Sequence, residues 1–297
     1  MKEEALLLGP HQSLVGVYTP AVPGGAPAAC KFAVVLLNAG LIHHVGPHRL
    51  HVKLARALAV RGISALRVDL SGIGDSSTRQ DNLSAAQLGF HEPREILDSL
   101  AQRGYEDFVL FGICSGAKHA LQAVAGDRRI KGLVLVNHES AREDAALSAQ
   151  VSAQYYLRRS FWNPRAWLNL FTGRVRNKAL FVTLAGELRR RWSAGWQKKM
   201  TLIEILHADL EPALAQGCRL LVVFSDRHAQ YAKLCGDGIQ GLQRDGQVEI
   251  AVYPEVDHLF TAIQAEEPLV ERVCRWAESL QSPPVPDRVT EVAAARE

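Results

Sequence analysis

The feature that most constrains the fold of this chain is a series of short, uninterrupted apolar runs that alternate with helical patterns. Such runs are typical of strands buried on both faces, as in a parallel sheet covered by helices. The runs that we interpret as strands are residues 31–37, 63–68, 107–111, 130–136, 219–224 and 248–253. Helical patterns cover residues 47–61, 91–103, 114–125, 203–215, 229–243 and 266–280, and residues 4–18 are typical of a β-hairpin. The alternation predicts an α/β fold with a mostly parallel, doubly wound sheet.

The alternation is interrupted between residues 141 and 200, and this interruption predicts the domain organisation. We expect residues 1–140 and 201–281 to form the core and residues 141–200 to form a helical cap, or lid. The cap is expected over the carboxyl edge of the sheet, where open α/β sheets place their ligands. Residues 282–297 are rich in proline and polar residues, so we expect a flexible C-terminal tail.

One predicted strand leads into a helix through a turn with small residues at fixed positions. The segment runs Val109-Leu110-Phe111-Gly112-Ile113-Cys114-Ser115-Gly116-Ala117. Gly112 and Gly116 lie two residues before and after Cys114, whereas Ser115 has Ile113 and Ala117 at those offsets. A strained strand-to-helix turn needs small residues at both offsets because strand and helix pass close together. Cys114 is therefore the predicted nucleophile, and Ser115 follows it.

These features resemble the α/β-hydrolase superfamily over about residues 4–281. Asn38-Ala39-Gly40, Gly46-Pro47-His48-Arg49, Leu54-Ala55-Arg56 and the stretch 67–76 look like serine-aminopeptidase-type and exosortase-associated hydrolases, and like capped thioesterases. The turn with a cysteine is similar to those of dienelactone hydrolase and of cysteine-nucleophile thioesterase domains. The resemblance implies the α/β-hydrolase fold and no cofactor. The departure from the usual pattern is the nucleophile, Cys114 in place of serine.

A catalytic triad follows in the chain order that this superfamily uses: nucleophile, acid, histidine. Asp226 comes directly after a buried strand, and His258 lies in the loop after the last strand. Both positions belong to the sheet edge that carries Cys114. His258 is expected to accept the thiol proton, and Asp226 is expected to orient its imidazole. Asp257 is the alternative acid.

The oxyanion hole of such a site needs two backbone donors. We expect the first to be the N–H of Ser115, the residue after the nucleophile. The second is expected from the loop after the first buried strand, where Leu41 N–H is the candidate.

The predicted cap has an unusual composition. It holds four tryptophans, which we interpret as candidate substrate contacts: Trp162, Trp167, Trp192 and Trp196. Between residues 156 and 199 there are eleven basic residues and one acidic residue, so this segment carries +10 and the rest of the chain −7. Such a segment favours an acidic partner, and Arg189, Arg190 and Arg191 are the candidate contacts. A solvated basic face is the alternative interpretation.

The histidines and cysteines are the residues in this sequence that could ligate a transition metal. His43, His44, His48 and His51 follow the predicted oxyanion loop, but their segment holds no cysteine or carboxylate that would complete a site, so no metal site is predicted. His43 is instead a candidate substrate contact. The five cysteines are scattered without a C-x-x-C pair, which favours reduced thiols.

Other sequence features indicate the cellular compartment of the protein. No run of about 18 apolar residues indicates a membrane span, and the N-terminus lacks the pattern of a secretory signal. We therefore expect a cytoplasmic protein without stable membrane insertion. Nucleic acid is not an expected partner, and the sequence leaves the oligomeric state open.

Cysteine at the nucleophile position favours acyl-thioester chemistry. An acyl-cysteine is itself a thioester, so exchange with another thioester is close to thermoneutral, and the intermediate stays reactive. The sequence thus predicts a thioesterase or acyltransferase that acts on acyl groups carried by coenzyme A or an acyl carrier protein. Two alternatives stay open: a hydrolase of small activated esters or lactones, and a binding module without catalysis.

Overall fold

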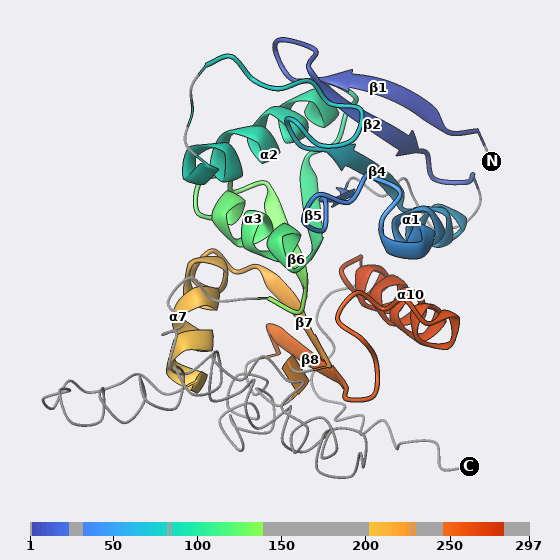
Figure 1. Cartoon of the computed structure of the whole chain (residues 1–297), viewed down its shortest axis with the longest axis vertical. Coiled ribbons are helices and arrows are strands. Elements are labelled where there is room, and N and C mark those ends of the chain that lie inside the picture. Colours follow the sequence, from blue (N-terminus) through green and yellow to red (C-terminus); the bar gives the residue numbers. More distant parts are fainter. Residues whose placement is uncertain are drawn as a thin grey trace, which may run out of the picture.

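The computed structural model describes residues 2–23, 32–81, 83, 85–138, 202–226, 228, 229 and 246–281. Its centre is an eight-stranded sheet (Figure 1), in the order β1-β2-β4-β3-β5-β6-β7-β8. The strands are β1 (Glu4–Leu8), β2 (Leu14–Thr19), β3 (Phe32–Leu36), β4 (Ser64–Asp69), β5 (Asp107–Ile113), β6 (Ile130–Val136), β7 (Arg219–Ser225) and β8 (Val248–Tyr253). The predicted cap and tail, with their tryptophans and arginines, and most of the predicted helix at 229–243 lie outside the described residues.

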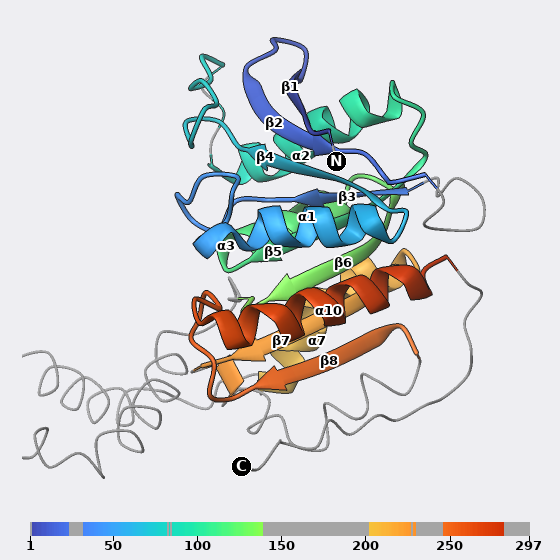
Figure 2. The same cartoon turned by 90° about the vertical axis from the view of Figure 1, so that its right-hand side faces the viewer.

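The pairing of the strands confirms the predicted fold class. β1 and β2 form the predicted hairpin, and β2 pairs antiparallel with β4. Every other neighbouring pair, from β4 through β3 to β8, is parallel. The carboxyl ends of these parallel strands therefore meet at one edge of the sheet (Figure 2). This edge receives the loops that carry the predicted site.

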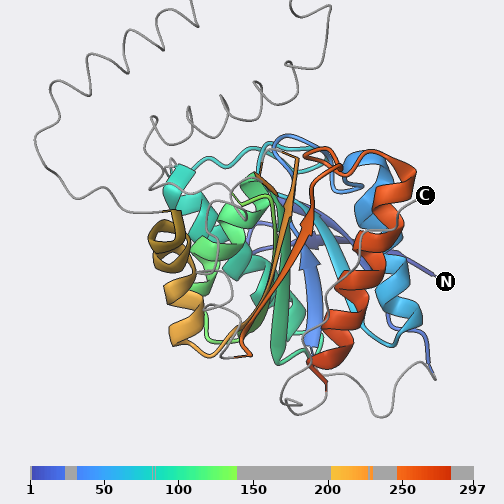
Figure 3. The ribbon, with the colours of Figure 1, turned by 90° about the horizontal axis from the view of Figure 1, so that it is seen from below.

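Helices cover both faces of the sheet, as Figure 3 shows. One face is covered by α1 (Leu50–Val60) and α10 (Ile263–Ser279), and the other by α2 (Ala85–Ala101), α3 (Ser115–Val124) and α7 (Leu202–Ala215). Each layer encloses its own core. Leu54 of α1 and Trp276 of α10 are buried in one, and Leu97 of α2 and Leu210 of α7 in the other. The continuous apolar runs form strands because both faces of the sheet are buried.

Two helices begin earlier than the sequence pattern predicts. α2 begins at Ala85 rather than residue 91, and α10 begins at Ile263 rather than residue 266. Gly89 and Pro93 weaken the helical pattern in the first turns of α2, which explains why the pattern predicts a later start. In the folded chain Gly89 lies against the flexible end of the Gln122 side chain on α3.

Among the helices that the structure describes, none combines the length and the apolar character needed to cross a bilayer.

Candidate active site

Cys114 lies at the tip of the turn between β5 and α3. Its backbone has φ 56° and ψ −114°, a conformation that residues with a side chain rarely adopt. Its N–H donates to Val136 O of the neighbouring strand at 2.9 Å, and its own carbonyl accepts from Ala117 N–H at 3.1 Å. These bonds hold the strained residue at the carboxyl edge, at the N-terminus of α3. Ser115, by contrast, is the first residue of the helix.

The two glycines that flank this turn are required by close contacts. A Cβ atom on Gly112 would lie 2.1 Å from the carbonyl carbon of Gly116. A Cβ atom on Gly116 would lie 2.6 Å from Asn38 O in the loop after β3. Contacts this short do not occur, so the register of the turn depends on glycine at both positions. This geometry places Cys114, and not Ser115, at the tip.

The partly buried Cys114 differs from the other cysteines that the structure describes. Cys218 and Cys274 are both buried. Burial raises the pKa of the Cys218 thiol to about 11 and that of the Cys274 thiol to about 12. Those two thiols are therefore poor nucleophiles near neutral pH, as expected of cysteines that fill the core. Cys30 and Cys235 lie outside the described residues.

Asp226 and His258 lie where the sequence predicts, in the loops after β7 and β8. Asp226 directly follows β7 and has a positive φ of 50°. The imidazole of His258 lies next to that of His228, with ring centroids 5.0 Å apart. His228 is buried and was not a predicted site residue. β5, β6, β7 and β8 are consecutive in the sheet, so Cys114, Asp226 and His258 share one edge.

The alternative acid, Asp257, has another role in this loop. Its carboxylate accepts hydrogen bonds from Thr261 N–H at 2.8 Å and from Leu259 N–H at 3.2 Å. Burial acts to raise the pKa of Asp257, but these backbone donors outweigh it and hold the pKa below its usual value. Asp257 therefore stabilises the turn that leads toward α10.

A residue that the sequence analysis missed, Asn137, connects the acid loop to the histidine loop. It directly follows β6, is fully buried and has a φ of 50°. Its side-chain oxygen accepts from Ser225 N–H, and its amide donates to Ser225 Oγ and to His258 O, each at 2.7 Å. Ser225 Oγ in turn donates to Asp257 O at 3.1 Å. Ser225 precedes Asp226, so this group of bonds, the Asn137 network, holds both loops beside Cys114.

The predicted oxyanion loop lies against the start of α3. Gly40 N–H donates to Ser115 Oγ at 2.7 Å, while the side chain of Leu41 is 87% exposed. Asn38 fixes the base of the loop. Its amide donates to Ile42 O and to Asp69, each at 2.8 Å, and its side-chain oxygen accepts from Leu70 N–H at 2.7 Å. The loop is thus held beside the residue that follows Cys114. Gly40, one residue before the predicted Leu41, is the position in contact with Ser115.

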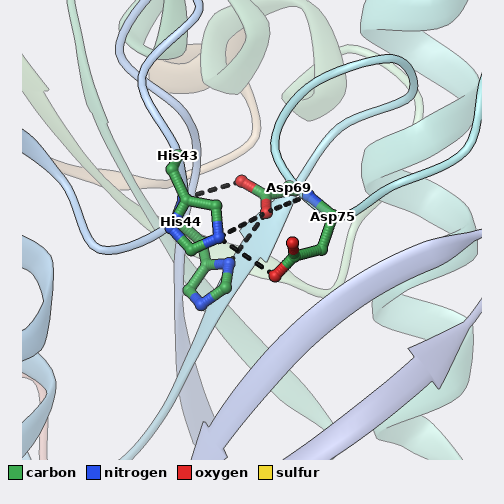
Figure 4. A group of neighbouring side chains, drawn as sticks. All are labelled: His43, His44, Asp69 and Asp75. Carbon is green, nitrogen blue, oxygen red and sulfur yellow. Dashed lines mark hydrogen bonds and ion pairs between the residues drawn. The ribbon is translucent and has the colours of Figure 1, made fainter.

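Two of the histidines that follow the predicted oxyanion loop lie beside two aspartates. Figure 4 shows His43 and His44 facing Asp69 and Asp75, a group that we call the His–Asp cluster. His44 Nδ1 lies 2.8 Å from Asp69 Oδ2, and His43 Nε2 lies 3.1 Å from Asp75 Oδ2 and 3.5 Å from Asp69 Oδ2. No metal site was predicted because the sequence showed no carboxylate that would complete one. The fold supplies two carboxylates, from the end of β4 and the loop beyond it.

The other two histidines of that segment do not join the cluster. His48 has a φ of 45° in the short turn before α1. His51 is fully buried in α1, where it packs edge-on against Phe111. Burial lowers the pKa of His51 to about 4, with a contribution from the charge of Arg67. His51 is therefore a neutral core residue.

The fold agrees with comparisons to known proteins. The sequence matches the alpha/beta hydrolase family over residues 34–272, which is most of the chain. The chain belongs to this family. No curated protein matches the chain.

Solved structures similar to this alpha/beta hydrolase share its fold at low sequence identity. The esterase PF2001 of Pyrococcus furiosus has a TM-score of 0.57 and 12% identity, over 95% of this chain and 91% of that one. XC6422 of Xanthomonas campestris, described as a serine hydrolase without a lid, has a TM-score of 0.51 and 16% identity, over 96% of this chain and 98% of that one. PA2218 of Pseudomonas aeruginosa, a hypothetical protein, has a TM-score of 0.54 and 14% identity, over 94% of this chain and 92% of that one. At these identities the likeness establishes the fold alone.

Proposed function

We propose that this alpha/beta hydrolase transfers acyl groups from thioesters through a covalent intermediate on Cys114. The observation that carries the proposal is the strained conformation of Cys114 at the tip of a turn that tolerates only glycine at positions 112 and 116. Strain of this kind is found at functional sites, where the surrounding structure maintains it. The N-terminus of α3 favours negative charge, so it favours the thiolate of Cys114 over the thiol.

The first half of the reaction forms the acyl-enzyme. His258 accepts the proton of the Cys114 thiol, and the sulfur attacks the thioester carbonyl. Backbone N–H groups of Ser115 and of the loop after β3 stabilise the oxyanion, and loss of one such donor costs roughly 100–1,000-fold in rate. The Gly40 N–H already donates to Ser115 Oγ, so Leu41 N–H stays the candidate for the second donor. The intermediate then releases the carrier thiolate, which takes the proton from His258.

The second half of the reaction returns the enzyme to its starting state. Water, or another nucleophile, attacks the acyl-Cys114 carbonyl while His258 accepts its proton. The tetrahedral intermediate collapses to the acid or the new acyl product, and the Cys114 thiolate regains its proton from His258. Asp226 holds the imidazole in the required tautomer throughout. An acyl-cysteine is a thioester, so neither half is strongly uphill, which suits a relay from one carrier to an acceptor.

Steady-state kinetics with two substrate series test this function. Acyl-N-acetylcysteamine thioesters and p-nitrophenyl esters of matched chain length are compared for wild type, Cys114→Ala and Ser115→Ala. We expect turnover of the thioesters, its loss in Cys114→Ala and its retention at a reduced level in Ser115→Ala. Preference for small esters or lactones would favour the alternative substrate class. Activity that survives Cys114→Ala and is lost in Ser115→Ala would assign the nucleophile to Ser115.

The basic segment between residues 156 and 199 is the proposed contact for an acidic acyl carrier. Coenzyme A carries phosphates and acyl carrier proteins are acidic, so both are attracted to a segment with a charge of +10. Charge reversal at Arg189, Arg190 and Arg191 is expected to raise KM for a carrier-bound substrate and leave the short thioester unaffected. Reversal at Arg128, Lys131 and Arg275, basic residues outside this segment, is the control. Unchanged KM in the first variant would refute this contact.

A further inference from the structure

The His–Asp cluster lies between two loops that the sheet brings together. β3 and β4 are parallel neighbours, so the loop with His43 and His44 emerges beside the end of β4 with Asp69 and the loop with Asp75. One ligand atom from each of the four side chains lies within 4.8 Å of the others. Imidazole nitrogen and carboxylate oxygen are both common zinc ligands.

The spacing of these atoms matches a tetrahedral ion. With zinc–ligand bonds of about 2.0–2.1 Å, tetrahedral ligand atoms lie about 3.3 Å from one another. Three of the six separations lie near this value: His44 Nδ1 to Asp69 Oδ2 is 2.8 Å, and His43 Nε2 is 3.1 Å from Asp75 Oδ2 and 3.5 Å from Asp69 Oδ2. All six lie within 4.8 Å, so an ion can be held after the side chains adjust around it.

Surrounding groups orient Asp69 as a ligand. Its Oδ1 accepts two hydrogen bonds, from His44 N–H at 2.6 Å and from the Asn38 amide at 2.8 Å. Its Oδ2 is thereby directed toward both imidazoles. Hydrogen bonds that fix a ligating carboxylate in this way are typical of built metal sites. Gly74 leaves the required room, because a Cβ atom there would lie 2.2 Å from Asp69 Oδ2 and 2.6 Å from His43.

The donor atoms and their exposure also favour a divalent cation. Two carboxylates and two imidazoles form a mixed oxygen and nitrogen donor set, which suits a divalent transition-metal ion. The side chains of His43 and Asp75 are 36% and 63% exposed, so an ion can reach the buried pair from solvent.

We propose that His43, His44, Asp69 and Asp75 bind a divalent transition-metal ion, with Zn²⁺ as the best match. His44 presents the lone pair of Nδ1 to the ion when its ring proton is on Nε2. The ion joins the loop after β3 to the loop after β4. This proposal goes beyond the acyl-transfer function, and none of its ligands belongs to the proposed triad.

Metal titration of the full-length chain tests the site. The parent protein carries Cys114→Ala, so that the Cys114 thiol cannot bind zinc together with a histidine. Zn²⁺ binding is measured by calorimetry, and Co²⁺ binding by the intense visible absorption of tetrahedral cobalt. We expect one ion per chain in the parent protein. His43→Ala and Asp75→Asn are each expected to weaken binding by at least about 10-fold.

Two controls keep the result interpretable. His91→Ala and Asp98→Asn change an exposed histidine and an exposed aspartate elsewhere on the chain, and both are expected to bind the ion as the parent does. Asp75 is at the surface, so Asp75→Asn is expected to fold normally, which circular dichroism verifies. No binding by the folded parent, or binding that both cluster variants retain, would overturn the proposal. The cluster would then be a hydrogen-bonded contact between the two loops.

Discussion

Replacement of Asn137 by alanine tests whether one buried amide holds the two loops of the proposed triad. The side chain is fully buried and makes three hydrogen bonds of 2.7 Å. Alanine leaves Ser225 N–H and His258 O without this partner, and each such buried group costs about 1–3 kcal/mol. The positive φ of 50° adds roughly 1 kcal/mol for alanine. We expect the free energy of unfolding to fall by about 3–7 kcal/mol.

Activity is expected to fall further than stability alone explains. The Asn137 network positions His258 and the neighbour of Asp226, and a displacement of about 1 Å in such a group can cost roughly 100-fold in rate. kcat is measured on an acyl-N-acetylcysteamine thioester under conditions where each variant is folded, and stability is measured by urea unfolding.

Three further variants separate the causes of this effect. Asn137→Gly relieves the backbone strain but lacks the amide. Asn137→Asp keeps the shape and the acceptor for Ser225 N–H, but places an oxygen against His258 O. Ser225→Ala loses only the hydroxyl and is expected to have the smallest effect. If Asn137→Gly keeps wild-type kcat and stability, the network does not position the triad and this reasoning is wrong.

Three other predictions concern the turn between β5 and α3, the cysteine thiols and the buried Glu92. Gly116→Ala places a Cβ atom 2.6 Å from Asn38 O, so we expect loss of soluble protein or at least about 3 kcal/mol of stability in urea unfolding. Iodoacetamide is expected to alkylate Cys114 well before the buried Cys218 and Cys274, as peptide mass mapping over time can show; equal rates would contradict an activated thiol. Burial raises the pKa of Glu92 above its ordinary value of 4.5, so its contribution to stability is present below pH 4.5 and is lost as pH rises through the folded-state value. Glu92→Gln is therefore expected to gain stability relative to wild type as pH rises, and a constant difference across that range would count against the buried charge.

The central strands, β3 to β7, were predictable because each one is buried on both faces. An apolar run with no polar alternation has few other structures available in a chain of this composition, and β3 to β8 lie within a residue or two of the predicted runs. The helix starts were less predictable. Gly89 and Pro93 lower the helix propensity of the first turns of α2, so the sequence pattern places its start later than Ala85.

The candidate site was predictable where strand order alone places a residue at the sheet edge. Cys114, Asp226 and His258 follow strands and were predicted from that fact. Asn137 also directly follows a strand, but nothing in its own segment indicates the loops that it joins.

The His–Asp cluster was not predicted, for a related reason. The histidines were compared only with their neighbours in sequence, whereas Asp69 and Asp75 approach through the parallel pairing of β3 with β4. Strand pairing could have supplied that signal, because parallel neighbours end at the same edge of a sheet.

The central claim is covalent catalysis at Cys114, and intact-protein mass spectrometry tests it most directly. Wild type, Cys114→Ala and Ser115→Ala are each mixed with acyl-N-acetylcysteamine thioesters of several chain lengths and quenched in acid. The account predicts a mass increase of one acyl group on wild type and on Ser115→Ala, and none on Cys114→Ala, with the preferred chain length reporting the size of the acyl pocket. An adduct that persists in Cys114→Ala, or no adduct and no turnover with any thioester, would contradict it.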